Sequence, residues 1–390
     1  MFDDIKESLF GSEKEEKKVE YIELVYDLIF VYLIGRNSSL MHLIQDGFII
    51  PHAFLTYLVG TLVIIQIWNY TTFYINRYGS NGFHDHMLML VNMFLLYFMA
   101  DAIRADWANY YFYKYNIAWV LILINILVHY WIKYRRFREE KPWEALQMTY
   151  TMIMLAVQTV IVIAAIVFYS FTGLSLTFLG VAFGVIYTIA ASRINTLVPV
   201  DFGHLTERAM LYVVFTFGEM IIAISGYFEG EVNLSGVYFA LMGFLIVVGL
   251  FQSYELCYDH LIDRGLITSG SGYMMIHLFL ILALSNITVA LEFMRREEVD
   301  LLPKTMFLAG SFVVYYVFLY LLAIYSKTKA RPSRKFIAGI IVLLAAFAVL
   351  MVILREYMYV NIALTVALVF ANLWIILKAK KAYDNACCNL

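Results

Sequence analysis

Cysteine is scarce in this chain, and its three cysteines form no pattern of known use. Cys257 stands alone, while Cys387 and Cys388 are adjacent, so neither a disulfide framework nor a metal-ligand spacing is present. The zinc motif HExxH and the phosphate-binding loop GxxxxGK[ST] do not occur, which disfavours metal catalysis and ATP-driven transport. We therefore expect neither a metal nor another cofactor.

Charge is scarce as well. Asp, Glu, Lys and Arg make up 15% of the residues, and the net charge of −2 argues against nucleic acid as a partner. Residues 1–20 lack the basic, apolar and cleavage regions of a signal peptide, so we expect none to be removed. The chain is instead rich in apolar residues. Hydrophobic residues make up 62% of it and aromatic residues 17%, and its mean hydropathy is +0.75. This composition predicts an integral membrane protein that has the lipid bilayer as its partner.

Apolar runs recur along the whole chain, and each is long enough to cross about 30 Å of hydrocarbon as a helix. We predict an all-α transmembrane bundle of twelve spans without a separate soluble domain. The predicted spans cover residues 19–40, 51–75, 86–105, 112–132, 148–171, 174–192, 207–228, 234–256, 273–294, 305–326, 336–354 and 358–378.

The basic residues predict how this bundle is oriented. With the N-terminus inside, 21 of the 28 Lys and Arg residues fall on the cytoplasmic side, which satisfies the positive-inside rule. Both termini are then cytoplasmic. The predicted organisation is a tail at 1–18, a six-helix repeat at 19–192, a second repeat at 193–378 and a tail at 379–390.

The two halves repeat charged residues inside apolar segments. His86, Asp101 and Arg104 each have a counterpart 191 residues later. These counterparts are His277, Glu292 and Arg295. Because six spans separate equivalent positions, both halves share one orientation, which predicts a parallel repeat about an axis along the membrane normal.

Carboxylates within the predicted spans are the main functional candidates. Glu23 and Asp27 are four residues apart and so lie on one face of a helix. Glu219 is the counterpart of Asp27 in the second half, and it shares a helix face with Arg208, eleven residues earlier. A charge near mid-bilayer costs roughly 2.5–3.5 kcal/mol, so each needs a reason. These carboxylates form either a proton- or cation-binding centre or ion pairs that lock the bundle.

Other charged residues lie nearer the ends of the predicted helices. His86 and His277 begin their helices from the cytoplasmic side, where they are either tolerated amphipathic residues or proton relays. Two pairs have the i,i+3 spacing of local ion pairs, and we expect them to anchor their helices. They are Asp101 with Arg104 and Glu292 with Arg295.

Two stretches resemble a known family. Residues 19–31, VEYIELVYDLIFV, resemble the N-terminal signature of the bacterial low temperature requirement A family, with Tyr26 where phenylalanine is commoner. The stretch HLTER at 204–208, followed by Gly218 and Glu219, resembles its second hallmark. His86 stands near where an arginine is more typical. The positions that match the signatures are Glu23, Asp27, His204, Glu207, Arg208 and Glu219.

The resemblance implies a multi-pass protein of the bacterial cell membrane. The family is named for growth at low temperature, which implies no settled biochemical activity. Function must therefore be argued from the site residues themselves.

From the membrane carboxylates we predict a proton- or ion-coupled secondary transporter of a solute that the sequence does not identify. Asp27 and Glu219 would bind the proton or cation near the central axis. Glu23, His204 and Arg208 would form a gating network on the cytoplasmic side.

Three alternatives remain open at this point. The same carboxylates could line a channel. A membrane enzyme could act on lipid with His204 and Glu207 as acid and base, although no nucleophile motif accompanies them. A structural or sensory protein could support growth at low temperature by responding to the bilayer. The sequence is compatible with an oligomer.

Overall fold

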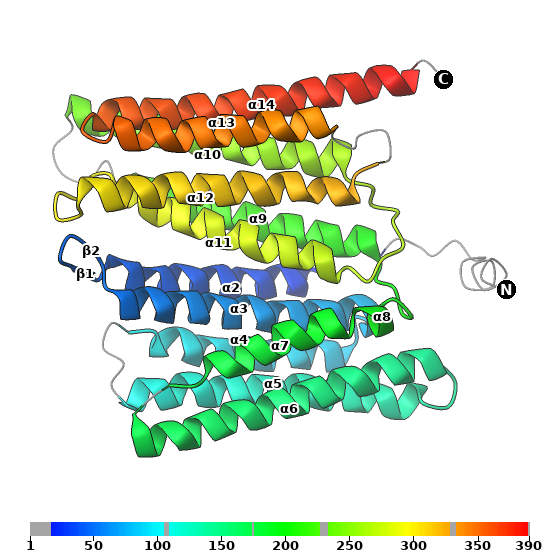
Figure 1. Ribbon diagram of the computed structural model, residues 1–390. Coiled ribbons are helices and arrows are strands. Elements are labelled where there is room, and N and C mark those ends of the chain that lie inside the picture. Colours follow the sequence, from blue (N-terminus) through cyan, green and yellow to red (C-terminus); the bar gives the residue numbers. More distant parts are fainter. Residues whose placement is uncertain (1–16, 105–108, 174, 227–232, 328–332, 389–390) are drawn as a thin grey trace.

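The chain forms one bundle of helices that run side by side, in the computed structural model shown in Figure 1. The structure describes residues 17–104, 109–173, 175–226, 233–327 and 333–388. Most of the predicted N-terminal tail, residues 1–16, lies outside the described residues. The main helices are α2 (Tyr21–Ser38), α3 (Pro51–Tyr78), α4 (Phe83–Ala102), α5 (Asn109–Phe137), α6 (Pro142–Thr172), α7 (Phe178–Ala190), α9 (Phe202–Ser225), α10 (Leu234–Leu256), α11 (Ser271–Phe293), α12 (Leu301–Leu321), α13 (Arg334–Ile353) and α14 (Met358–Cys388). The short elements are η1 (Ser39–His42), β1 (Ile44–Gln45), β2 (Phe48–Ile49), α8 (Ser192–Asn195), η3 (Cys257–Leu261) and η4 (Leu322–Tyr325).

Ten described helices are long and apolar enough to cross a membrane, namely α3 to α6 and α9 to α14. Two predicted spans fall outside this set. The helix α2 has 18 residues but carries Glu23, Asp27 and Arg36, and α7 has only 13 residues. The all-α membrane fold is therefore confirmed, while the count of twelve spans stays a prediction.

Local sequence sets where several helices begin and end. Pro51 and Pro142 occupy the first turns of α3 and α6, where a missing N–H costs nothing. The side chain of Asp201 caps α9 by accepting a hydrogen bond from the backbone N–H of His204. Gly173 ends α6 with a φ of +69°, a left-handed conformation that glycine adopts without strain.

The two halves of the bundle pack their helices in matching pairs. In the first half, α2 contacts α3 and α4, α4 contacts α5, α5 contacts α6, α6 contacts α7, and α7 returns to α3. In the second half, α9 contacts α10 and α11, α11 contacts α12, α12 contacts α13, α13 contacts α14, and α14 returns to α10. The halves meet where α2 contacts α9 and α11, in the middle of Figure 1.

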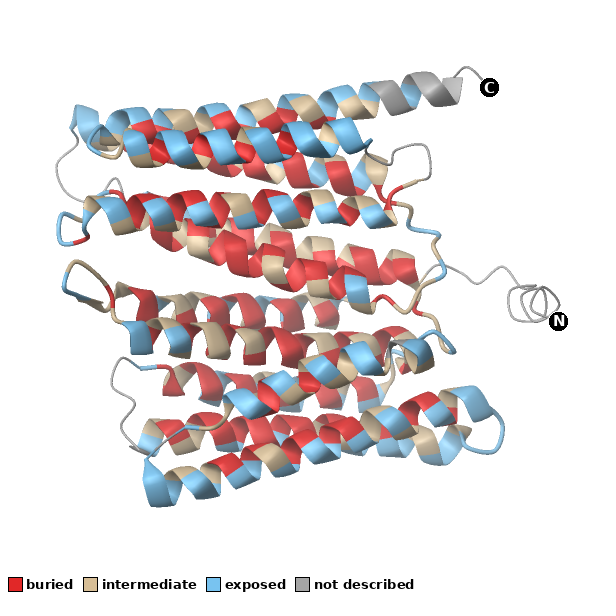
Figure 2. Cartoon of the chain, in the orientation of Figure 1, coloured by how far each residue is buried: buried red, intermediate tan, exposed pale blue. Residues whose placement is uncertain are grey.

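Burial separates central helices from peripheral ones. In the most apolar stretch of α11, 72% of residues are buried, against 22% in α13. Figure 2 shows the same contrast, with buried residues along the central helices and exposed ones on the outer faces of α6 and α13. The peripheral helices offer apolar side chains to lipid, and the central ones enclose polar groups.

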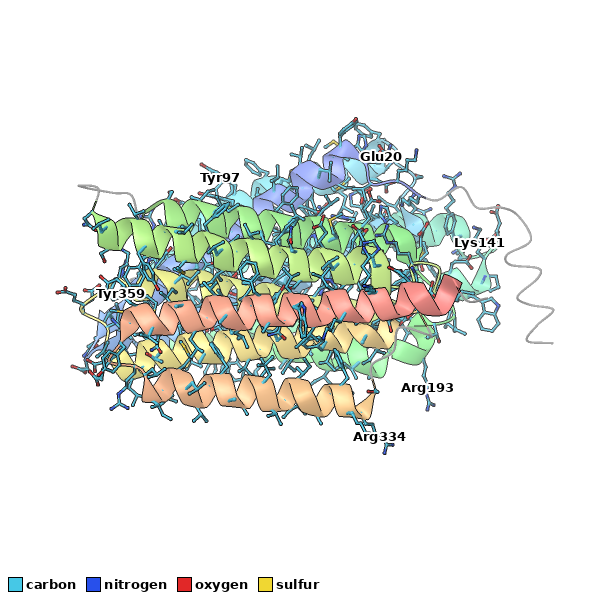
Figure 3. The ribbon with its side chains drawn as sticks, turned by 90° about the horizontal axis from the view of Figure 1, so that it is seen from above. Glu20, Tyr97, Lys141, Arg193, Arg334 and Tyr359 are labelled. Carbon is cyan, nitrogen blue, oxygen red and sulfur yellow. The ribbon has the colours of Figure 1, made fainter. Side chains whose placement is uncertain are left out.

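Labelled side chains identify the two ends of the bundle. Lys141, Arg193 and Arg334 lie at the end where α2 begins and α14 ends, while Tyr359 lies at the opposite end (Figure 3). We call the first the basic end. The opposite one, which carries the β1–β2 hairpin, is called the hairpin end.

Candidate functional site

Arg208 of α9 lies between two carboxylates of α2. Its Nη2 contacts Asp27 Oδ1, and its Nη1 lies 3.1 Å from Glu23 Oε2. The i,i+4 spacing turns both carboxylates toward α9. Arg208 and Asp27 are 0% exposed, and Glu23 is 2% exposed. One guanidinium, with donors in a fixed fork, thus holds two buried acids across the contact between the halves.

Trp68 of α3 completes the surroundings of Asp27. Its Nε1 donates a hydrogen bond of 2.7 Å to Asp27 Oδ1, and its ring lies 4.5 Å from that of Tyr212. The guanidinium carbon of Arg208 is 6.0 Å from the Trp68 ring. The sequence analysis did not single out Trp68, because it lies in an apolar run, where a tryptophan is expected to be part of the hydrophobic core. Its indole N–H, which needs a partner when buried, was the one available signal.

A hydrogen-bond chain orients His204 toward Glu23. The backbone N–H of Asp201 donates to Asn76 Oδ1 at 3.0 Å, which directs the Asn76 amide nitrogen to His204 Nδ1, also at 3.0 Å. Nδ1 must therefore accept, and the proton of a neutral ring sits on Nε2, 3.4 Å from Glu23 Oε2. His204 Nε2 thus points toward Glu23 Oε2, although the two atoms do not form a hydrogen bond.

A cavity of about 320 Å³ reaches this cluster from the basic end. Glu23 and Asp85 line it, together with Lys17 and Lys18. Lys17 Nζ donates to the backbone carbonyls of Ile75, which it contacts, and Gly79, at 3.2 Å. Burial lowers the pKa of Lys17, against the attraction of Glu23 and Asp85. Glu23 is thus the acid of the cluster that faces the basic end.

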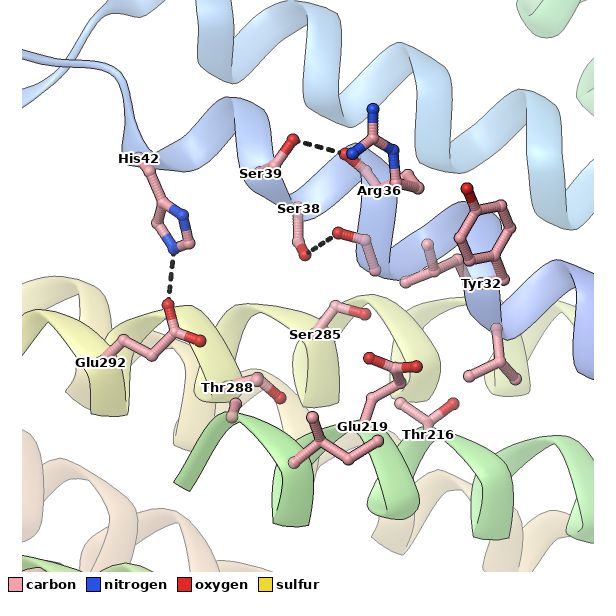
Figure 4. A pocket seen from close by; sticks show the side chains of 15 residues that line it. Tyr32, Arg36, Ser38, Ser39, His42, Thr216, Glu219, Ser285, Thr288 and Glu292 are labelled. Carbon is pink, nitrogen blue, oxygen red and sulfur yellow. Dashed lines mark hydrogen bonds and ion pairs between the residues drawn. The ribbon is translucent and has the colours of Figure 1, made fainter. Parts of the chain in front are cut away.

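A second cavity, of about 280 Å³, enters from the hairpin end between α2, α9 and α11 (Figure 4). Glu219 lines it and makes no hydrogen bond or ion pair within the described ranges. A Cβ at Gly35 would lie 3.0 Å from Glu219 Oε2, so a larger residue at this position would push the carboxylate away by a few tenths of an ångström. Near it, His42 Nε2 lies 2.6 Å from Glu292 Oε2.

Asp27 and Glu219 occupy different surroundings. Arg208 and Glu219 are eleven residues apart on α9, or about 16 Å along the axis. Asp27 is sealed in the ion cluster, whereas Glu219 faces a cavity. The structure therefore brings Glu23, Asp27, His204 and Arg208 together and places Glu219 apart from them.

The two predicted i,i+3 pairs differ from each other in the contacts that they make. Arg104 Nη2 lies 3.4 Å from Asp101 Oδ1, and Lys114 also contacts that carboxylate. Glu292 lies against His42 of η1. The guanidinium of Arg295 donates a hydrogen bond of 2.8 Å to the backbone carbonyl of Gly226. In the second half, therefore, the side chains of Glu292 and Arg295 each contact another part of the chain.

The other predicted residues do not join the cluster. His86 lies 2.7 Å from Asn81 at the surface, while His277 is fully buried, with Nε2 2.8 Å from the hydroxyl of Tyr254. These two histidines, 191 residues apart in the sequence, thus have unlike environments. Glu207 makes no hydrogen bond or ion pair within the part of the chain that the structure describes, and His204 faces Glu23 instead.

One family model matches the chain. Its description is bacterial low temperature requirement A protein, and the match covers residues 18–371, from just before α2 into α14. No curated protein matches the chain.

Proposed function

The chain belongs to the bacterial low temperature requirement A family, as its two motifs predict, and we propose that it is an ion-coupled secondary transporter with Glu219 at its ion site. One observation carries this proposal. Two cavities enter the bundle from opposite ends, and the buried Asp27–Arg208 contact lies between the acids that they reach.

This arrangement suits alternating access better than a pore. A channel needs a continuous polar path, whereas Asp27, Arg208 and Trp68 pack into a fully buried barrier. A carrier needs such a barrier, with acids accessible from each side in turn. Glu23 faces the basic end, and Glu219 faces the hairpin end.

We further propose twelve spans in two parallel repeats, 19–192 and 193–378, with both termini cytoplasmic. The matching packing pairs of the two halves support this, as does the recurrence of charged residues at an interval of 191. The position of Lys141, Arg193 and Arg334 at one end of the bundle supports the orientation. The helices α2 and α9 would then be equivalent, and they meet at the centre.

The ion cluster would act as the gate on the cytoplasmic side. Arg208 lies on α9, and its two carboxylate partners lie on α2, so the contact joins the two proposed repeats. Rocking one repeat against the other must break or rearrange it. His204, whose ring is oriented by Asn76 with Nε2 3.4 Å from Glu23 Oε2, would keep Glu23 in position for Arg208 to return.

The test is flux in proteoliposomes that contain a pH dye, across a panel of proton and cation gradients. We expect Glu219→Gln to abolish pH-linked or cation-linked flux in protein that still folds and inserts. The matched control is Glu356→Gln at the hairpin end, where the side chain is 64% exposed, and flux should persist in it. Undiminished flux in Glu219→Gln, or no flux of folded wild type under any gradient, would contradict the proposal.

A purely structural role predicts a different pattern. Asp27→Asn and Glu219→Gln would then lower stability without removing any separable activity. Thermal unfolding measured beside flux distinguishes the two roles, because the ion site predicts lost flux in Glu219→Gln with little change in stability.

A further inference from the structure

Around Glu219 the hairpin-end cavity presents mainly hydrogen-bond acceptors, and we propose that it binds a compact monocation, Na⁺ or a primary ammonium group, through oxygens of Glu219, Thr216 and Ser285. This inference rests on the proposed function and deepens it. It names the class of ion that occupies the Glu219 site in place of a bare proton.

The hydroxyls around this cavity donate their protons elsewhere. Thr216 and Thr288 donate to the backbone carbonyl four residues earlier, at 3.0 and 2.9 Å. Ser38 donates to the carbonyl three residues earlier, at 2.8 Å. Since a hydroxyl has one proton and two lone pairs, these groups can offer the cavity only lone pairs. Such a lining attracts a cation and disfavours an anion.

Ser285 provides a separate indication of a ligand. It is 4% exposed and lines the cavity, and its Oγ has no partner with hydrogen-bond geometry among the described residues. The hydroxyl of Tyr57 lies near it but donates to Asn286 Oδ1 at 2.8 Å. Figure 4 shows Ser285 beside Glu219, with Thr216 on the other side of that carboxylate. A buried hydroxyl of this kind lacks a partner that a bound cation would supply.

The charges of the cavity lead to the same conclusion. Glu292 contacts His42, which leaves Glu219 as the carboxylate of the cavity without such a partner in the described ranges. Arg36 also lines the cavity, but Figure 4 shows its guanidinium turned away from Glu219. A cation at Glu219 would therefore meet a free carboxylate and two hydroxyl oxygens, which are the hard ligands that small cations prefer.

The cavity is large enough for either kind of cation. The cavity measures about 280 Å³, and a water occupies about 30 Å³ of liquid. It therefore has room for a hydrated Na⁺ or for the ammonium end of a small organic amine. The ligand chemistry is shared, and the experiment separates the two.

The experiment measures thermal unfolding and equilibrium binding of the purified full-length chain in detergent. Sodium chloride, potassium chloride and methylammonium chloride are compared at constant ionic strength, with the chloride of a bulky organic cation as the reference. We expect saturable stabilisation by Na⁺ or by methylammonium, which identifies the source. It should vanish in Glu219→Gln, and Thr216→Val or Ser285→Ala should weaken binding about tenfold each.

The matched control is Ser225→Ala. Ser225 lies at the end of α9, and its hydroxyl donates to the carbonyl of Ile222, but it does not line the cavity. Binding should be unchanged in this variant. Equal unfolding temperatures in all four salts would overturn the inference, and so would saturable binding that survives in folded Glu219→Gln.

Flux measured beside binding keeps the two proposals apart. If proton flux depends on Glu219 but the protein binds none of these cations, the result supports the transporter proposal and refutes the cation site. If cation binding depends on Glu219 but no gradient produces flux, the result supports the cation site and refutes the transporter proposal.

Discussion

At the scale of single residues, the contact of Arg208 with Glu23 and Asp27 depends on the shape of the guanidinium. Its fork reaches carboxylates on two successive turns of α2, which a lysine ammonium, a single point charge, cannot do. Removing the charge leaves two acids buried without a cation. Breaking a buried ion pair from one side typically costs about 3–5 kcal/mol.

We therefore expect Arg208→Met to lower the free energy of unfolding by about 3–5 kcal/mol, and Arg208→Lys to lower it by less, since the charge remains. Denaturant titration of the purified protein measures both. Arg193→Lys, at an exposed site, is the matched control and should change it by no more than about 0.5 kcal/mol. Wild-type stability in Arg208→Met would show that the contact does not hold the halves together.

At the scale of an element, Gly35 shows a conflict between helix stability and the site. Alanine within a helix is more stable than glycine by up to about 1 kcal/mol. At Gly35, however, the added Cβ would come within 3.0 Å of Glu219 Oε2 and displace the carboxylate. A methyl group on α2 thus acts on a carboxylate of α9.

Gly35→Ala should accordingly keep or raise the unfolding temperature while reducing cation binding and flux at least several-fold. Gly310→Ala in α12 is the control, because its Cβ would meet no atom within 4 Å, and it should raise stability without changing flux. If Gly35→Ala transports and binds like the wild type, the carboxylate does not need its present position.

At the scale of the whole molecule, the halves touch again at the hairpin end. His42 follows α2, Glu292 ends α11, and their side chains lie 2.6 Å apart beside the cavity. The backbone N–H of Asp300 also donates a hydrogen bond of 2.7 Å to the carbonyl of Gly47, in the turn between β1 and β2. If the repeats rock, these contacts must separate during each cycle.

A cross-link across this contact should therefore stop transport. His42→Cys combined with Glu292→Cys, in a chain with serine at 387 and 388, is treated with a short bifunctional thiol reagent that reducing agent cleaves. Flux should fall to background and return on cleavage. Each single cysteine variant, treated alike, should keep its flux, and full flux in the cross-linked protein would exclude rocking at this end.

Much of the fold follows from the sequence alone. Ten predicted spans correspond to helices that can cross a membrane, because a long apolar run in lipid must satisfy its backbone within one helix. The family was also predictable, since its signatures lie in short contiguous stretches such as residues 204–208. The spacing of Glu23 and Asp27 correctly placed both on one helix face.

What only the tertiary structure decided is which charges meet. Sequence comparison of the halves made Asp27 and Glu219 equivalent, yet Arg208 contacts the first and leaves the second in a cavity. The contributions of Trp68, Asn76 and Ser285 come from α3 and α11, far away in the chain. Spacing along a helix determines which face a side chain takes. The partner opposite that face depends on how distant helices pack, and no local pattern encodes that packing.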